Sequence, residues 1–211
     1  MIKPSYRYFV HPRWLTLILL LWMPWSQAST LLIVGDSLSA AYGVQQETGW
    51  VGLLQKRLNE HTAGAWSVVN ASISGETTDG GLRRLPELLA THKPRITLIE
   101  LGGNDGLRGF PVSVIRRHLN DMVDLARAAD SEVILVGMHV LPNYGPRYSR
   151  AFHEIYTSLA REKRIPLVPF FLEGIYDQPG MMQDDRIHPT QAAQPILLEN
   201  VWPTLKPLLD R

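Results

Sequence analysis

The sequence predicts an α/β fold in which a five-stranded parallel sheet lies between two layers of helices. Short apolar runs alternate five times with segments whose apolar residues recur at the helical period of 3.6. This alternation is typical of a parallel sheet that helices cover on both faces. The chain also shows no internal repeat, low-complexity tract or linker, so we expect residues 29–211 to form one domain.

The first predicted strand is a continuous apolar run that ends in glycine, as a buried parallel strand does. The five predicted strands are residues 31–35, 67–71, 96–101, 132–137 and 167–171. In open parallel sheets, binding sites form at the carboxyl ends of the strands. We therefore expect the segments directly after these runs to carry the chemistry of the protein.

Four helices are predicted between the strands from apolar stripes at helical spacing. The stripes are Trp50, Val51, Leu54 and Leu58; Leu82, Leu85 and Leu89; Ile115, Leu119, Met122 and Ala126; and Phe152, Ile155, Tyr156 and Leu159. Thr190 is predicted to cap a last helix. Pro195, Pro203 and Pro207 predict that this helix is short or broken, because proline has no backbone N–H.

Residues 1–28 have the pattern of a secretory signal peptide. Three basic residues precede an apolar run at residues 14–25, and Ser26-Gln27-Ala28 forms a small-x-small cleavage site. The apolar run has 12 residues, fewer than the roughly 20 that a membrane-spanning helix needs. We therefore expect export and removal of this segment; retention as a membrane anchor is the alternative.

Composition argues against several other classes of function. Three of the 21 basic residues lie in residues 1–28, so the rest of the chain has 18 basic and 20 acidic residues. No basic stripe remains that would favour nucleic acid as a partner. The chain contains no cysteine, which rules out a cysteine nucleophile and a thiolate metal site. The histidines that precede residues 184–189 have no carboxylate or cysteine partner at metal-ligand spacing, so no metal site is predicted.

Polar segments, most of them with glycine, follow all five predicted strands. They are Gly35-Asp36-Ser37-Leu38-Ser39, Ser72-Ile73-Ser74-Gly75-Glu76, Gly102-Gly103-Asn104-Asp105, residues 138–148 and residues 184–189. Because the carboxyl ends of parallel strands lie along one edge, these segments should converge. We expect Asp36 to fix its turn by hydrogen bonding to the backbone.

These segments supply the four chemical groups that hydrolysis of an acyl bond needs. Ser37 is the candidate nucleophile and His188 is its candidate base. Asp185 precedes His188 by three residues and can reach the Nδ1 side of the imidazole. The backbone N–H groups of Ser37 and Gly75 and the side-chain amide of Asn104 can donate to an oxyanion. Each signal alone is weak, and their order along the chain makes the case.

Together the four blocks resemble those of the SGNH, or GDSL, hydrolases. They read Gly35-Asp36-Ser37-Leu38, Gly75, Gly103-Asn104-Asp105, and residues 185–188. The resemblance covers essentially all of residues 29–211, and it is strongest to the multifunctional bacterial thioesterases of that family. It implies a three-layer, flavodoxin-like fold, a periplasmic monomer, and no metal or cofactor. It also implies activity on fatty acyl thioesters, lysophospholipids and short aryl esters, without stable membrane insertion after processing.

By the same resemblance, Ser37, Asp185 and His188 form a catalytic triad, and Ser37, Gly75 and Asn104 form an oxyanion hole. Residues 106–111 resemble a loop that closes over acyl chains. With two residues of a later loop, the expected substrate-binding residues are Gly106, Leu107, Arg108, Gly109, Phe110, Pro111, Pro142 and Tyr144. Arg186 stands where we expect a glycine in close relatives, which could alter the rim of the site.

Two alternative functions stay open at this point. A carbohydrate O-deacetylase would use the same groups, although no clear cluster of aromatic residues indicates a sugar platform. The second alternative is a non-catalytic ligand-binding protein, which would not need a nucleophile, a base, an orienting group and oxyanion donors together. An ordinary α/β-hydrolase is excluded, because the chain has no Gly-x-Ser-x-Gly motif.

Overall fold

The computed structural model describes residues 28–140 and 144–210. The predicted signal peptide, apart from Ala28, lies outside the described residues, and so does Pro142. Within the described ranges, every helix is too short or too polar to span a bilayer.

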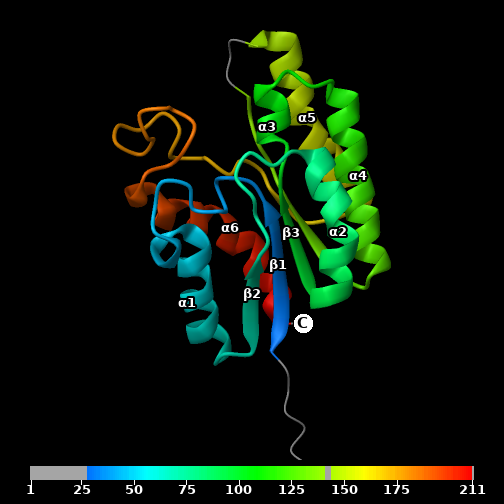
Figure 1. The fold of residues 1–211 in the computed structure, drawn as a ribbon, viewed down its shortest axis with the longest axis vertical. Coiled ribbons are helices and arrows are strands. Elements are labelled where there is room, and N and C mark those ends of the chain that lie inside the picture. The colour runs from blue at the N-terminus through cyan, green and yellow to red at the C-terminus, as the bar shows by residue number, and fades with distance from the viewer. Residues whose placement is uncertain (1–27, 141–143, 211) are drawn as a thin grey trace, which may run out of the picture.

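A sheet of five parallel strands forms the centre of the molecule, in the order β2-β1-β3-β4-β5 (Figure 1). The strands are β1 (Ser29–Gly35), β2 (Trp66–Asn70), β3 (Ile96–Glu100), β4 (Glu132–Val136) and β5 (Leu167–Val168). Every residue of β3 and the last five of β1 are buried. Burial on both faces explains why these strands read as continuous apolar runs. The predicted fold class is confirmed.

The fifth strand is shorter than predicted, two residues in place of five. Pro169 follows Val168, and proline has no N–H to give to the ladder. Pairing resumes outside the strand, where the N–H of Phe171 donates to the carbonyl of Gly137 at 2.9 Å. The strand therefore ends three residues earlier than its apolar pattern suggests.

Helices cover both faces of the sheet (Figure 1). On one face, α1 (Trp50–Thr62) packs against α6 (Gln194–Leu209). On the other face, α4 (Val112–Ala128) packs between α2 (Thr78–His92) and α5 (Pro146–Lys163). Every residue of the four predicted stripes is buried except Leu82, which is partly exposed. Three short helices complete the described chain: η1 (Gln46–Thr48), α3 (Gly103–Leu107) and η3 (Gln191–Ala193).

The prediction that the last helix is short or broken is wrong, since α6 runs for 16 residues. Pro195 sits in its first turn, where a backbone N–H would have no helical partner in any case. Pro203 and Pro207 lie on the exposed side, so water can reach the carbonyl groups that they leave unpaired. The opposite side of α6 is buried against the core and holds the helix together. Thr190 does not cap α6, because it precedes η3 and its hydroxyl donates to the Gly180 carbonyl at 2.8 Å.

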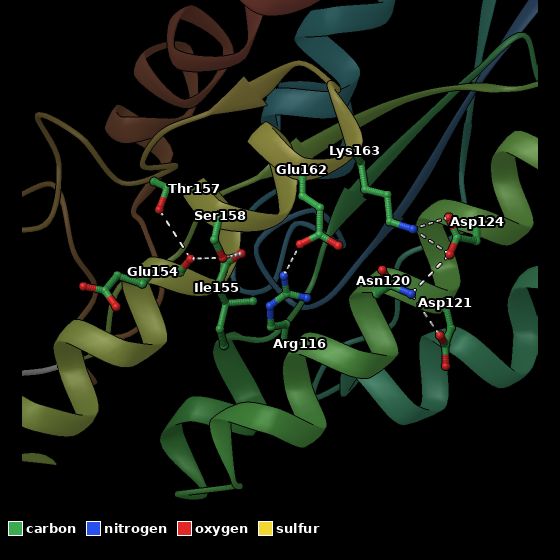
Figure 2. Close-up of polar contacts among 10 residues, drawn as sticks. All are labelled: Arg116, Asn120, Asp121, Asp124, Glu154, Ile155, Thr157, Ser158, Glu162 and Lys163. Atoms are coloured by element: carbon green, nitrogen blue, oxygen red, sulfur yellow. Dashed lines mark hydrogen bonds and ion pairs between the residues drawn. The ribbon is translucent and has the colours of Figure 1, made fainter.

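Charged side chains join the outer sides of α4 and α5 (Figure 2). Arg116 pairs with Glu162 at 2.5 Å, and Lys163 pairs with Asp124 at 2.6 Å. Both acidic partners are more than half exposed, and such pairs contribute about 0–1 kcal/mol each. The buried stripes between the two helices therefore supply most of the stability of this layer.

Tyr156 of α5 fixes the turn that leaves β3. Its buried hydroxyl donates to the carbonyl of Leu101 at 2.9 Å. Gly102 follows with φ of +110°, and a Cβ at this position would collide with the Tyr156 hydroxyl. This contact sets the direction in which the chain enters α3, which begins at Gly103 and carries Asn104.

We expect Tyr156→Phe to lower the free energy of unfolding by about 1–2 kcal/mol, because it leaves the buried Leu101 carbonyl without a partner. Urea unfolding followed by circular dichroism measures the change. Tyr176→Phe is the matched control at an exposed position and should change stability by less than about 0.5 kcal/mol. Equal losses in the two variants would contradict the role given to this hydrogen bond.

Candidate active site

The candidate active site lies at the carboxyl ends of β1 and β3, at the upper end of the sheet in Figure 1. The chain passes from β1 to β2 on one side and then returns to β3 on the other. Loops diverge at such a switch point and leave a crevice between them. Ser37 follows β1 and Asn104 lies in α3 after β3, so the topology brings both residues to this crevice.

Ser37, His188 and Asp185 form one hydrogen-bonded chain. Nε2 of His188 lies 2.9 Å from Oγ of Ser37. Nδ1 of the same ring lies 2.6 Å from Oδ2 of Asp185. The fold thus joins a residue after the first strand to a loop 151 positions later. This is the geometry of a nucleophile, a base and a group that orients the base.

The loop that carries His188 is held by its own hydrogen bonds. Oδ1 of Asp185 accepts from the backbone N–H groups of Ile187 at 2.9 Å and His188 at 3.0 Å. The N–H of Gln183 donates to the His188 carbonyl at 2.7 Å. Desolvation raises the pKa of Asp185, but the hydrogen bonds from His188 and Ile187 outweigh it and lower that pKa to about 2. Asp185 is therefore ionised at neutral pH and can fix the imidazole in one orientation.

A buried carboxyl holds the turn that carries Ser37. Oε2 of Glu100, the last residue of β3, accepts from the Ser39 hydroxyl at 2.7 Å and from the Asp36 N–H at 3.2 Å. A Cβ at Gly35 would lie 2.7 Å from this oxygen, so glycine is needed there. Burial raises the pKa of Glu100 well above its ordinary value, and the neighbouring Asp36 raises it further. Sequence analysis missed Glu100; its one signal is an acidic residue at the end of an apolar run.

Asp36 links this turn to Asn104. Oδ1 of Asp36 accepts from the backbone N–H of Leu38 at 3.0 Å, so the expectation that Asp36 fixes its own turn is confirmed. Oδ2 accepts from the side-chain amide of Asn104 at 3.0 Å, a contact that sequence analysis did not foresee. Burial raises the pKa of Asp36 to about 6, although the bonds from Leu38 and Asn104 and the charge of His188 partly offset it.

The three candidate oxyanion donors face one pocket. Ser37, Gly75 and Asn104 all line it. One amide hydrogen of Asn104 goes to Asp36, which leaves the second for a ligand. Gly75 has φ of +78°, and its carbonyl accepts a hydrogen bond from Arg108 at 3.1 Å. This bond holds the Gly75 backbone in place.

The pocket has a volume of about 550 Å³, within the range of small-molecule sites. Much of its wall is apolar and comes from α3 and from the segments that follow β4 and β5. This wall includes Leu107, Met138, Val140, Phe170, Leu172 and Met182. Met138 and Val140 belong to residues 138–148, which were expected at this edge although the two side chains were not singled out. Phe170, Leu172 and Met182 were missed, because residues 169–182 have no periodicity that would mark them as a wall.

The expected substrate-binding segment lies only partly at this pocket. Leu107 lines it, whereas Gly106 is buried below and a side chain there would collide with Val140 and Phe152. Tyr144 does not line the pocket, but its hydroxyl donates to the Leu107 carbonyl at 2.6 Å and so holds the segment. Arg108 binds the Gly75 carbonyl as described above. The remaining members of the segment lie away from the pocket lining: Gly109, Phe110 and Pro111.

Comparison with known proteins decides the family. The model of the GDSL-like lipase/acylhydrolase family matches residues 33–195. The chain belongs to this family. The matched range contains Ser37, Gly75, Asn104, Asp185 and His188. The predicted family and enzyme class, an acyl hydrolase, are therefore confirmed.

Two named relatives are similar to this chain over most of its length. Esterase TesA of Pseudomonas aeruginosa is 57% identical over 182 residues, which are 86% of this chain and 90% of the relative. A crystal structure of TesA, covering 85% of this chain and 99% of its own, superposes with a TM-score of 0.83. Thioesterase 1/protease 1/lysophospholipase L1 of Escherichia coli is 47% identical over 183 residues, with 87% and 86% of the two chains covered.

A third similar protein is the psychrotrophic esterase EstA from Pseudoalteromonas sp., whose structure was solved as inhibited by monoethylphosphonate. It is 43% identical, covers 87% of this chain and 100% of its own, and has a TM-score of 0.81. The fold and family of this GDSL-like hydrolase therefore stand on sequence and structure together.

We expect the stability of the protein to fall as pH rises through the pKa of Asp36. The folded pKa, about 6, lies above the ordinary value of 3.8, so the contribution of Asp36 is full below about pH 4 and is lost above about pH 6. The difference corresponds to roughly 3 kcal/mol. Asp36→Asn cannot ionise, so its stability relative to the wild type should rise by about this amount between pH 4 and pH 7.

Urea unfolding of both proteins at several pH values measures this difference. Asp177→Asn, at an exposed position, controls for the general effect of removing a carboxylate. A stability difference between Asp36→Asn and the wild type that stays constant from pH 4 to pH 7 would contradict the buried, raised-pKa carboxyl.

Proposed function

We propose that this hydrolase is an exported enzyme that cleaves fatty acyl thioesters and carboxylic esters through an acyl-enzyme on Ser37. The observation that carries the proposal is the hydrogen-bonded chain from Ser37 through His188 to Asp185, which opens into a pocket with an apolar wall. The chain supplies an activated nucleophile, and the pocket supplies room for an acyl group.

In the first step, Oγ of Ser37 attacks the acyl carbon while Nε2 of His188 takes the hydroxyl proton. The distance of 2.9 Å between these atoms allows direct transfer. The ionised Asp185 keeps Nδ1 protonated, so Nε2 is the basic nitrogen, and it stabilises the imidazolium that forms.

The oxyanion of the tetrahedral intermediate accepts hydrogen bonds from the N–H groups of Ser37 and Gly75 and from the Asn104 amide. Each such donor contributes roughly 3–4 kcal/mol in comparable sites. Asp36 is a positioning residue here, because its carboxylate only accepts and therefore keeps the NH₂ side of Asn104 turned towards the pocket.

In the second step, His188 gives its proton to the leaving thiol or alcohol, and the acyl group stays on Ser37. A water molecule then attacks the ester, and His188 takes a proton from it. Collapse of this second intermediate releases the fatty acid and returns the proton to Oγ. Apart from substrate and water, these steps use only side chains and backbone groups of this chain, so the proposal includes no cofactor.

Several further points belong to the same proposal. Residues 29–211 form the hydrolase domain, and residues 1–28 direct it to the periplasm as a signal peptide that is then removed. We propose a monomer that acts on small acyl esters, acyl thioesters and lysophospholipids rather than on nucleic acid. The names of the relatives, which include an esterase, a thioesterase and a lysophospholipase, support this range of substrates.

Hydrolysis of p-nitrophenyl esters and acyl-CoA by residues 29–211, across acyl chain lengths, tests the proposal. We expect activity on medium and long acyl chains. Ser37→Ala should lower kcat by at least about 10³-fold without unfolding the protein, because the hydroxyl has no substitute. Unchanged activity in Ser37→Ala would overturn the assignment of the nucleophile. Activity confined to acetyl esters would favour a carbohydrate O-deacetylase instead.

A further inference from the structure

Arg186 has a backbone conformation that is unfavourable for arginine. Its φ is +57°, in the left-handed region where only glycine is free of steric cost. The N–H of Arg186 donates to the Gln183 carbonyl at 2.9 Å, a bond that glycine would make equally well. Lys93 and Arg164 adopt similar φ values at helix ends, so the conformation is tolerated here, but it does not require an arginine.

The guanidinium of Arg186 has no partner within the described part of the chain. It forms no ion pair and no side-chain hydrogen bond there. The neighbouring Asp185 is already engaged, since its two oxygens take three donors from Ile187 and His188. Arg186 is exposed, and yet it lines the pocket. A free cation at the pocket edge can therefore meet a ligand.

The surroundings of Arg186 fit an amphiphilic ligand. Among the described residues that line this pocket, it is the only lysine or arginine. Tyr42, Tyr176 and Ile187 also line the pocket and are 51%, 51% and 38% exposed, among the few large apolar side chains exposed in the described chain. Arg108 is not among these lining residues, and its guanidinium already binds the Gly75 carbonyl. The pocket edge thus combines apolar surface with a single available positive charge.

The position of Arg186 relates it to the leaving group. It lies two residues before His188, and in the proposed mechanism the imidazole of His188 gives its proton to the leaving oxygen or sulfur. In the sequence the cation is therefore close to the imidazole that faces the leaving group, whereas the apolar wall would take the acyl chain. The planar guanidinium of arginine suits the paired oxygens of a phosphate better than the point charge of lysine does.

We propose that Arg186 forms a subsite for a phosphate group carried by the leaving group of the substrate. The inference rests on the proposed function and adds a preference to it, for acyl esters or thioesters whose alcohol or thiol bears phosphate. Two leaving groups have this chemistry, a glycerol phosphate and coenzyme A. Arg186 acts on binding and selectivity, and it takes no part in proton transfer.

The test compares substrates that differ only in phosphate. The first pair is 1-octanoyl-glycerol 3-phosphate and 1-octanoyl-glycerol. The second pair is S-octanoyl-4′-phosphopantetheine, which is the acylated arm of coenzyme A, and S-octanoyl-pantetheine. All are used below their micelle concentrations. For each pair, the ratio of kcat/KM for the phosphate substrate to kcat/KM for the neutral one measures selectivity, so a general loss of activity cancels.

We expect Arg186→Gln to lower this selectivity ratio roughly tenfold, as the loss of a charge-assisted hydrogen bond does. Arg186→Lys should lower it less, and added salt should bring the wild type closer to Arg186→Gln. Arg117→Gln, at an exposed position on α4, is the matched control and should leave the ratio unchanged. The pair whose ratio falls identifies the source of the phosphate. An unchanged ratio in both pairs overturns the subsite.

A binding measurement separates failure of the subsite from failure of the proposed function. In the Ser37→Ala background, calorimetry gives the Kd of intact 1-octanoyl-glycerol 3-phosphate without turnover. Adding Arg186→Gln should raise this Kd roughly tenfold, whereas adding Arg117→Gln should not change it. If the wild type hydrolyses none of the substrates, the proposed function fails, and the Kd values still decide whether Arg186 binds phosphate. Equal Kd values with and without Arg186→Gln would refute the subsite directly.

Discussion

The geometry of the site depends on the buried carboxyl of Glu100. One of its oxygens accepts from the Asp36 N–H and the Ser39 hydroxyl, so it ties the end of β3 to the turn after β1. These two strands are neighbours in the sheet, and Gly35 pairs with Glu100 in their register. Because a buried acceptor without partners is costly, the turn is strongly held in the one arrangement that satisfies this oxygen. Ser37 takes its place from that arrangement.

Further hydrogen bonds connect the turn held by Glu100 to the other parts of the site, and they are present without substrate. Asp36 carries the constraint across to Asn104, which places an oxyanion donor beside the nucleophile turn. The loop that carries His188 lies near the C-terminal end of the chain. Its conformation is held by hydrogen bonds that Asp185 accepts from Ile187 and His188. Catalysis by acyl hydrolases draws much of its rate from donors that are already in position. A site assembled from four separate segments of the chain needs such internal bonds to keep that position.

The sequence predicted what depends on local pattern and missed what depends on tertiary contact. Continuous apolar runs identified the strands, because burial on both faces leaves a plain signature. The prolines of α6 misled because the burial of its other side outweighs the two lost hydrogen bonds. The order of the motifs predicted that Ser37 and His188 act together, and the fold places the two side chains in contact. Glu100 was missed because a glutamate ending a strand looks the same whether it is exposed or, as here, buried beneath a turn.

The hydrogen-bonded chain from Asp185 through His188 makes Ser37 the nucleophile in the proposed mechanism. The most direct test is labelling of residues 29–211 with a reactive phosphonate ester, followed by peptide mass spectrometry and assay of the remaining esterase activity. We predict one adduct per chain, on Ser37, with activity lost in proportion, and much slower labelling of Asp185→Asn. Labelling of a different residue, or full activity in a chain labelled at Ser37, would contradict the account.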